Sequence, residues 1–214
     1  MANIDEIVEG VYRIATFDDR TGMFFNQYLI EDEKATLVHT GAAPIFEGVL
    51  ECISRVTDPA ALAYAFISHF EADECGALPM LMSVAKNLVP VGSAVTARQL
   101  AGFGICTNTL VQNEDDVLSL GRRRLRFITY PSEMHLWDGL LAYEEADGVL
   151  FTSDLFIRRG RFDSAVVPAD IAEVLDIANA SIPSDEAREA CLAKLRALDI
   201  AILALGHGPA LDVR

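Results

Sequence analysis

The sequence predicts a single α/β domain, residues 1–214, in which strands and helices are arranged in layers. Three observations lead to this prediction. Short runs of β-forming residues alternate with amphipathic stretches through the first half of the chain. A second group of β-runs, two helical stretches and a last apolar run fill the second half. No Pro/Gly/Ser-rich linker or low-complexity tract divides the chain, so we expect one domain.

The first half alternates strands with helices. The predicted strands are residues 8–16, 26–30, 35–39, 61–68 and 88–94. Of these, 61–68 is a near-continuous apolar run, which is typical of a buried strand. A helical pattern begins at Pro44, because proline is tolerated in a first helical turn. Two further helices are predicted at 74–86 and 96–102, the first with apolar residues at helical spacing.

The second half begins with several β-runs in succession. The predicted strands are residues 116–120, 122–130, 139–143, 148–153 and 200–205. Two helices, at 168–180 and 184–198, separate the fourth of these strands from the last. Ser184 is a suitable N-cap, and Asp185 and Glu186 in the first turn complement the helix dipole.

Composition excludes several classes of protein. Hydrophobic residues make up 51% of the 214 and charged residues 23%, which is the balance of a globular domain. Seventeen Lys and Arg against 32 Asp and Glu leave a formal net charge of −15. An excess of this size repels phosphate backbones and anionic lipid headgroups. We therefore expect no binding to nucleic acid or to a membrane surface.

Targeting signals and cysteine pairs are also missing from the sequence. No run approaches the roughly 20 apolar residues of a spanning helix, and the acidic N-terminus lacks the basic region of a secretion signal. The four cysteines are scattered singly with no Cys-x-x-Cys pair. This spacing argues against a zinc ribbon or a disulfide framework. We expect a cytoplasmic protein with reduced thiols.

The chain contains only four histidines, and each stands at the end of an apolar run or in a short polar loop. They are His39, His69, His135 and His207. Ligands of α/β proteins bind in the crevice beyond the ends of the strands. One histidine in such a place is more often a capping or core residue than a ligand. Four in such places favour a common site.

The segment from His69 to Gly76 carries the strongest signal of this site. His69, Glu71 and Asp73 alternate with apolar residues, so in an extended segment their side chains point to one side. The alternative is a solvated loop with acidic residues. That alternative does not explain acids directly after a buried strand, where charges are costly unless paired or bound to metal. One imidazole with two or three carboxylates suits iron or manganese better than structural zinc.

Four motifs in order make the sequence similar to the metallo-β-lactamase superfamily. They are His-x-Glu-x-Asp at 69–73, the loop histidine His135, Asp154 after Leu-Phe-Thr-Ser, and Gly-His207-Gly. Glutamate at the second position resembles the flavodiiron branch, whose di-iron sites bind and reduce oxygen or nitric oxide. Hydrolases of the superfamily usually carry His-x-His-x-Asp-His and bind zinc. The resemblance implies a four-layer αββα sandwich with the metals at the strand edges between two sheets.

The resemblance also implies a ligand set. It assigns His69, Glu71 and His135 to one iron and Asp73 and His207 to the second, with Asp154 and an oxo or hydroxo group bridging the two ions. Three imidazoles and three carboxylates form a suitable neutralising shell for two ferrous ions.

Two positions depart from the family pattern. The pattern continues with histidine after the aspartate, where this chain has Glu74. Glu74 is a seventh ligand, an outer hydrogen-bond acceptor, or the acidic first turn of the following helix, and we favour the last. The superfamily has aspartate before Thr40-Gly41, where this chain has His39. One interpretation is that His39 hydrogen-bonds a ligand carboxylate or moves protons near bound oxygen. The other is that it is a neutral residue outside the ligand set with no role in catalysis.

The same resemblance frames the expected function. Flavodiiron enzymes carry a flavodoxin domain whose FMN delivers electrons, and these 214 residues contain no FMN-binding loop. We therefore expect a stand-alone di-iron protein that binds dioxygen for sensing or carriage. Reduction of oxygen or nitric oxide would need a separate electron donor. Oxygen sensing would need a signalling partner. A homodimer is expected by analogy alone. The alternative function is a zinc-dependent lactonase or thioesterase in the same fold.

Overall fold

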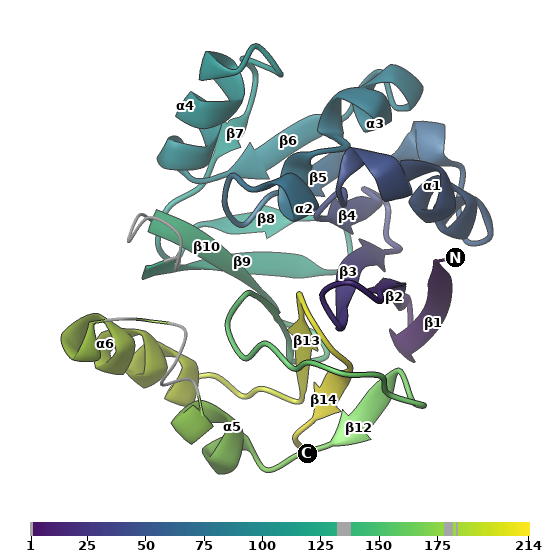
Figure 1. Ribbon diagram of the computed structural model, residues 1–214. Coiled ribbons are helices and arrows are strands. Elements are labelled where there is room, and N and C mark those ends of the chain that lie inside the picture. The colour runs from purple at the N-terminus through teal and green to yellow at the C-terminus, as the bar shows by residue number, and fades with distance from the viewer. Residues whose placement is uncertain (1, 132–137, 178–181, 183) are drawn as a thin grey trace.

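The computed structural model describes residues 2–131, 138–177, 182 and 184–214. Two seven-stranded sheets pack face to face, and helices cover the outer face of each (Figure 1). Helices α1, α3 and α4 lie over the first sheet, and α5 and α6 lie over the second. The predicted αββα sandwich is confirmed.

The first sheet contains β1 to β7 in sequence order. Its strands are β1 (Asn3–Val8), β2 (Val11–Asp18), β3 (Met23–Ile30), β4 (Thr36–Val38), β5 (Tyr64–Phe66), β6 (Val89–Gly92) and β7 (Leu110–Val111). Neighbours up to β4 are antiparallel, and β4 to β7 are parallel. Parallel neighbours require crossover connections, and helices supply them here.

The second sheet has the order β12-β14-β13-β11-β10-β9-β8. Its strands are β8 (Val117–Ser119), β9 (Arg124–Pro131), β10 (Asp138–Glu144), β11 (Val149–Ser153), β12 (Val166–Pro168), β13 (Ile202–Leu205) and β14 (Ala210–Asp212). Strands β8 to β11 form an antiparallel meander, and β11 pairs with β13 in parallel. This pairing places the loops after β11 and β13 at the same edge.

The helices are short, and several carry capping side chains. They are η1 (Ala43–Ile45), α1 (Phe46–Ser54), η2 (Pro59–Ala61), α2 (Ala72–Cys75), α3 (Leu78–Val84), α4 (Ala94–Gly102), α5 (Ile171–Ile177) and α6 (Asp185–Arg196). The hydroxyls of Ser93 and Ser184 accept backbone N–H groups at the starts of α4 and α6. Ser184 is therefore the N-cap that the sequence predicts.

The strands alternate in side-chain direction, which produces three apolar layers. In β13, Ile202 and Ala204 point into the layer between the sheets, while Leu203 and Leu205 face α5 and α6. Aromatic rings contribute to the layer between the sheets, where Phe66 and Phe127 contact each other with tilted rings at 5.3 Å between centroids. The rings lie at the centre of the molecule, so they hold the two sheets at a fixed separation.

Some predicted element boundaries are wrong. The predicted helix 74–86 is two helices, α2 and α3, and α2 begins earlier, at Ala72. The backbone bends at Gly76 and Ala77, and Pro79 lies in the first turn of α3, where proline is tolerated. Strand β1 was not predicted, because its residues, Asn-Ile-Asp-Glu-Ile-Val, do not alternate between apolar and polar at this sheet edge. Strands β7, β12 and β14 have only two or three residues and were also missed.

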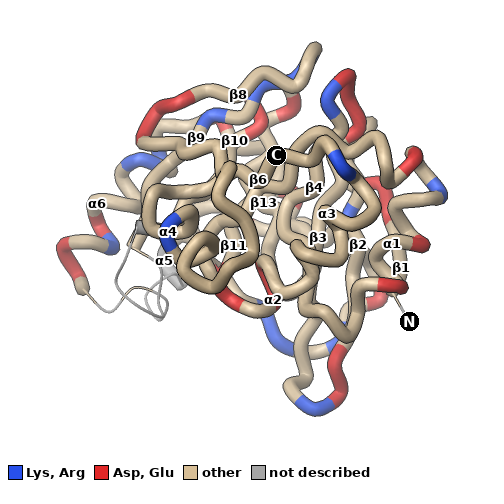
Figure 2. The backbone as a smooth tube through the Cα atoms, turned by 90° about the horizontal axis from the view of Figure 1, so that it is seen from above, with Lys and Arg blue, Asp and Glu red and all other residues tan. Residues whose placement is uncertain are grey.

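Charged residues lie mainly on the outer turns and helices of the molecule, with uncharged segments between them (Figure 2). No helix within the described part of the chain is long and apolar enough to span a membrane.

Candidate metal centre

The candidate site forms where strand ends from both sheets meet. His69 follows β5 of the first sheet, and Asp73 and Glu74 lie in α2 directly after it. Asp154 follows β11, and His207 follows β13, in the second sheet. Because β11 and β13 are parallel, their carboxyl ends lie side by side. The cluster therefore spans the edge between the two sheets, as the sequence predicts.

One group of potential ligands consists of His69, Glu71 and Asp154. The Nε2 atom of His69 lies 3.2 Å from Oε2 of Glu71 and 3.4 Å from Oδ2 of Asp154. His69 and Asp154 are buried, whereas the Glu71 side chain is one-third exposed. The ligand atoms of this group lie within 4.8 Å of one another, around a common point.

A second group consists of Asp73, Glu74 and His207. The Nε2 atom of His207 lies 3.4 Å from Oδ2 of Asp73, and the three ligand atoms lie within 4.8 Å of one another. Asp154 joins the two groups, because its other oxygen, Oδ1, lies 3.2 Å from Nε2 of His207. One carboxylate thus points an oxygen at each histidine.

Five of the six predicted ligands come together in this way. His69, Glu71, Asp73, Asp154 and His207 converge. The sixth, His135, lies outside the described residues.

The β2–β3 hairpin holds the His207 loop in place. Nδ1 of His207 hydrogen-bonds the carbonyl of Phe24 at 2.9 Å, which turns Nε2 toward the carboxylates. The Phe25 ring stands edge-on to the imidazole, 5.0 Å between centroids. Asn26 donates from Nδ2 to the carbonyls of Leu205 and Gly208, on both sides of His207. These contacts fix the ring orientation before any ligand binds.

A serine network supports His69 from behind. The hydroxyl of Ser68 lies 3.1 Å from Nδ1 of His69, 2.7 Å from Oγ of Ser153 and 2.9 Å from Nε2 of His39. His39 is buried at the end of β4, where its φ of 61° is left-handed. Sequence reasoning missed Ser68 and Ser153. The available signal was that each serine stands directly before a predicted ligand at a strand end.

Burial and neighbouring charge shift the pKa of several groups here. Burial lowers the pKa of His39 to about 3, and the nearby His69 adds to this effect, so His39 is neutral. Burial also works against a charge on His207, but hydrogen bonds to Asp154 and Asp73 outweigh it and raise its pKa to about 10. His207 therefore carries a proton in the metal-free protein, which a metal ion would displace.

The two acids of α2 shift in opposite directions. Burial works to raise the pKa of Asp73, but the hydrogen bond with His207 outweighs burial and holds that pKa low. Burial raises the pKa of Glu74, and the nearby Asp73 and Asp154 raise it further. The sequence places Glu74 correctly in a first helical turn, but its side chain is buried instead of facing solvent.

The donor set fits hard or borderline divalent ions. Four carboxylates and two imidazoles from the described residues surround the cluster. Oε2 of Glu74 is buried without a hydrogen-bond partner among those residues. Buried acids in this number are costly unless a cation neutralises them. Carboxylate-rich sites with imidazole favour iron or manganese over structural zinc.

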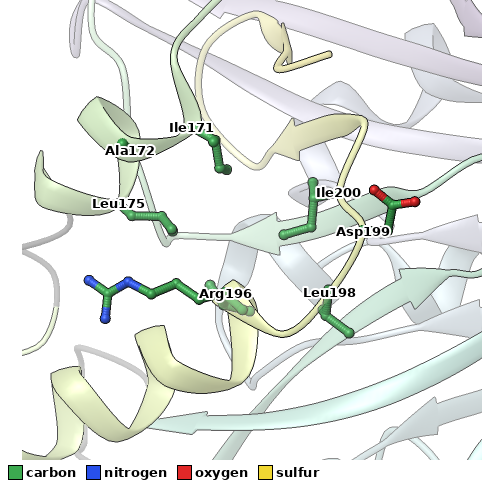
Figure 3. Close-up of a pocket in the computed structure, with 8 residues that line it drawn as sticks. Ile171, Ala172, Leu175, Arg196, Leu198, Asp199 and Ile200 are labelled. Carbon is green, nitrogen blue, oxygen red and sulfur yellow. The ribbon is translucent and has the colours of Figure 1, made fainter.

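A separate groove of about 440 Å³ lies between α5 and the segment that follows α6. Figure 3 shows its apolar lining, which includes Ile171, Leu175 and Ile200, with Arg196 at one side. None of the candidate ligands that the structure describes contributes to this groove.

Two facing sheets between helices, with histidines and carboxylates gathered at their shared edge, define a metallo-β-lactamase-like domain. The family described as ODP family beta lactamase matches residues 23–208. The chain belongs to this family.

Curated relatives extend the comparison. Rubredoxin-oxygen oxidoreductase from Megalodesulfovibrio gigas is 33% identical over 139 residues, which cover 63% of this chain and 34% of the relative. Nitric oxide reductase from Moorella thermoacetica is 29% identical over 142 residues, which cover 65% of this chain and 35% of the relative. Diflavin flavoprotein A 1 from Synechocystis sp. is 28% identical over 204 residues, which cover 91% of this chain and 35% of the relative. The chain thus spans about a third of the length of these relatives.

Solved structures share the fold. A metal-soaked flavodiiron core from Synechocystis sp. superposes with a TM-score of 0.83 at 24% identity, covering 99% of this chain and 57% of that one. A flavoprotein from Thermotoga maritima superposes with a TM-score of 0.84 at 20% identity, covering 99% of this chain and 58% of that one. The predicted resemblance to the flavodiiron branch is confirmed.

Proposed function

We propose that the protein is a non-haem di-iron protein that binds dioxygen. In this proposal His69, Glu71 and His135 would hold one iron, Asp73 and His207 would hold the second, and Asp154 would be shared by the two. The observation that carries this proposal is the position of Asp154, whose two oxygens lie 3.4 Å from Nε2 of His69 and 3.2 Å from Nε2 of His207. Similarity to relatives named rubredoxin-oxygen oxidoreductase and nitric oxide reductase also supports it.

Two ferrous ions would supply both the binding site for dioxygen and the electrons that it accepts. The chain's own residues prepare that site. Ser68 and the carbonyl of Phe24 orient the two imidazoles through their Nδ1 atoms. Phe25 packs edge-on against the His207 imidazole. The Glu71 side chain is one-third exposed, so it is the most solvent-accessible of the described candidate ligands.

The finer role that we favour is oxygen sensing or carriage. Two relatives are named nitric oxide reductase and rubredoxin-oxygen oxidoreductase, and both names describe reactions that consume electrons. Turnover by the residues described here would require an electron donor outside them. A protein that binds dioxygen without turnover suits a carrier, or a sensor whose oxygenated form is read by a partner.

An optical spectrum tests the proposal. Protein loaded anaerobically with ferrous iron is mixed with an oxygen pulse, and absorption is recorded from the mixing time onward. We expect a new charge-transfer band that persists or decays slowly. Rapid bleaching with repeated oxygen consumption, once a reductant is added, would favour a reductase. Retention of zinc instead of iron, with no spectral change and with cleavage of a lactone or thioester, would contradict the proposal and favour the hydrolase.

A further inference from the structure

Glu74 is a buried carboxylate for which the described residues supply no lysine or arginine partner, and its side chain lies within hydrogen-bonding reach of another acid, Asp73. Its side chain is 2% exposed, and Oε2 has no hydrogen-bond partner among the described residues. The nearest cationic candidate is His69, whose Nε2 lies 3.7 Å from that oxygen. Asp73 and Asp154 lie close enough to repel the charge. A buried charge in such surroundings is unfavourable unless something else binds it.

Glu144 shows how the same chain buries a structural glutamate. Its side chain is 0% exposed and lies 3.1 Å from Nη1 of Arg123. Its two oxygens also accept the backbone N–H groups of Ala146 and Asp147, each at 2.9 Å. Glu144 is thus neutralised by a cation and satisfied by two donors. Glu74 is equally buried, but among the described residues it has neither a lysine or arginine partner nor a backbone donor for Oε2.

The backbone fixes the direction in which Glu74 points. The amide of Thr40 donates to the Glu74 carbonyl at 2.7 Å, and its hydroxyl lies 3.2 Å from the same oxygen. This pins α2 against the loop after β4. The side chain then enters the cluster, where its ligand atom lies within 4.8 Å of those of Asp73 and His207.

We infer that Glu74 is a protein ligand of the metal held by Asp73 and His207. This inference rests on the proposed metal centre. The metal position beside His207 would then have three carboxylates, from Asp73, Glu74 and the shared Asp154, and one imidazole. It would be richer in carboxylate than the position beside His69. Hard oxygen donors favour Mn²⁺ and iron over zinc. This chain therefore replaces the family histidine by a charged oxygen ligand at one of its two positions.

Glu74→Gln tests the inference, because it preserves shape and removes the charge. Chelator-stripped protein is titrated anaerobically with Fe²⁺ or Mn²⁺, and bound metal is measured by equilibrium dialysis. We expect two equivalents in the wild type. In E74Q the first equivalent should bind as in the wild type, whereas the affinity for the second should fall. Loss of a residue that only hydrogen-bonds a ligand costs roughly 10- to 100-fold in metal affinity, and we expect a larger fall here. Glu144→Gln is the matched control and should keep both equivalents.

Thermal melting of the metal-free proteins supplies a second readout. E74Q should melt at or above the wild type, because the described residues give Glu74 no lysine or arginine contact that the amide would lose, whereas E144Q should melt below, because it breaks the contact with Arg123. Two equivalents at wild-type affinity in E74Q, or a metal-free E74Q that is unfolded, would overturn the inference. Wild type that binds fewer than two equivalents would overturn it together with the di-iron proposal. Loss of the second equivalent in E74Q supports the inference whether or not the loaded protein reacts with oxygen.

Discussion

At the residue scale, the candidate ligands are positioned by neighbours as much as by their own chemistry. His69 has Ser68 and Ser153 behind its Nδ1 atom, and His207 has the Phe24 carbonyl. His39 reaches the same Ser68 hydroxyl from the first sheet. It is therefore an outer positioning residue, and its neutral, buried state has a consequence for stability.

Replacing His39 by asparagine should flatten the dependence of stability on acid pH. The pKa of His39 is about 3 when folded and 6.5 ordinarily. Below pH 6.5 the unfolded chain binds a proton that the folded chain refuses, so His39 lowers the free energy of unfolding by about 1.4 kcal/mol per pH unit. Asparagine tolerates the left-handed φ and does not titrate.

Urea unfolding of the metal-free proteins at pH 7, 6 and 5 measures this difference. The wild type should lose stability more steeply than H39N on acidification. Equal slopes for the two proteins would show that His39 is protonated in the folded state and that its burial has no such effect.

At the element scale, α2 carries two of the candidate acids on a single helical turn. Its position depends on close packing at Gly76, where a Cβ would overlap the carbonyl oxygen of Ala72 and lie 3.3 Å from Cα of Ala42. Both obstacles are backbone atoms, so neither can yield cheaply. The glycine thus lets α2 approach the loop after β4 and brings Asp73 and Glu74 into the site.

Gly76→Ala should therefore destabilise the protein by about 1–3 kcal/mol, as overpacking does, and weaken metal binding. Gly102→Ala is the matched control, because a Cβ added there, at the end of α4, would have no neighbour within 4 Å. That variant should be neutral or slightly more stable, since alanine favours helix over glycine. Chemical unfolding and metal content check both variants. Gly76→Ala that matches Gly102→Ala in both measurements would refute the role of close packing.

At the scale of the whole molecule, the sequence predicts the layers and the site location for different reasons. Hydrophobic periodicity predicts the two halves, because each strand face packs into its own apolar layer. Strand-end position predicts His69, Asp154 and His207. Local patterns could not predict the burial of Glu74, because burial depends on how α2 packs against the loop after β4. They could not predict the serine network either, since it joins strand ends from both sheets.

The position of the site across both sheets makes metal binding a stability effect for the entire domain. The first sheet contributes His69 and the acids after it, and the second contributes Asp154 and His207. A metal at 100 times its dissociation constant stabilises the folded state by about 2.7 kcal/mol. For a domain of this size that corresponds to a melting temperature raised by roughly 5–10 °C.

Asp154→Asn distinguishes a shared bridge from two independent sites. If Asp154 serves both positions, D154N should lose most of the metal-dependent rise in melting temperature and most of both bound equivalents. Asp212→Asn is the control, because Asp212 pairs with the exposed Arg214 at a strand end away from the cluster. Differential scanning calorimetry with and without Mn²⁺, followed by chelator, measures the effect. A full metal-dependent rise in D154N would mean that both ions bind without Asp154, and the bridging role would be wrong.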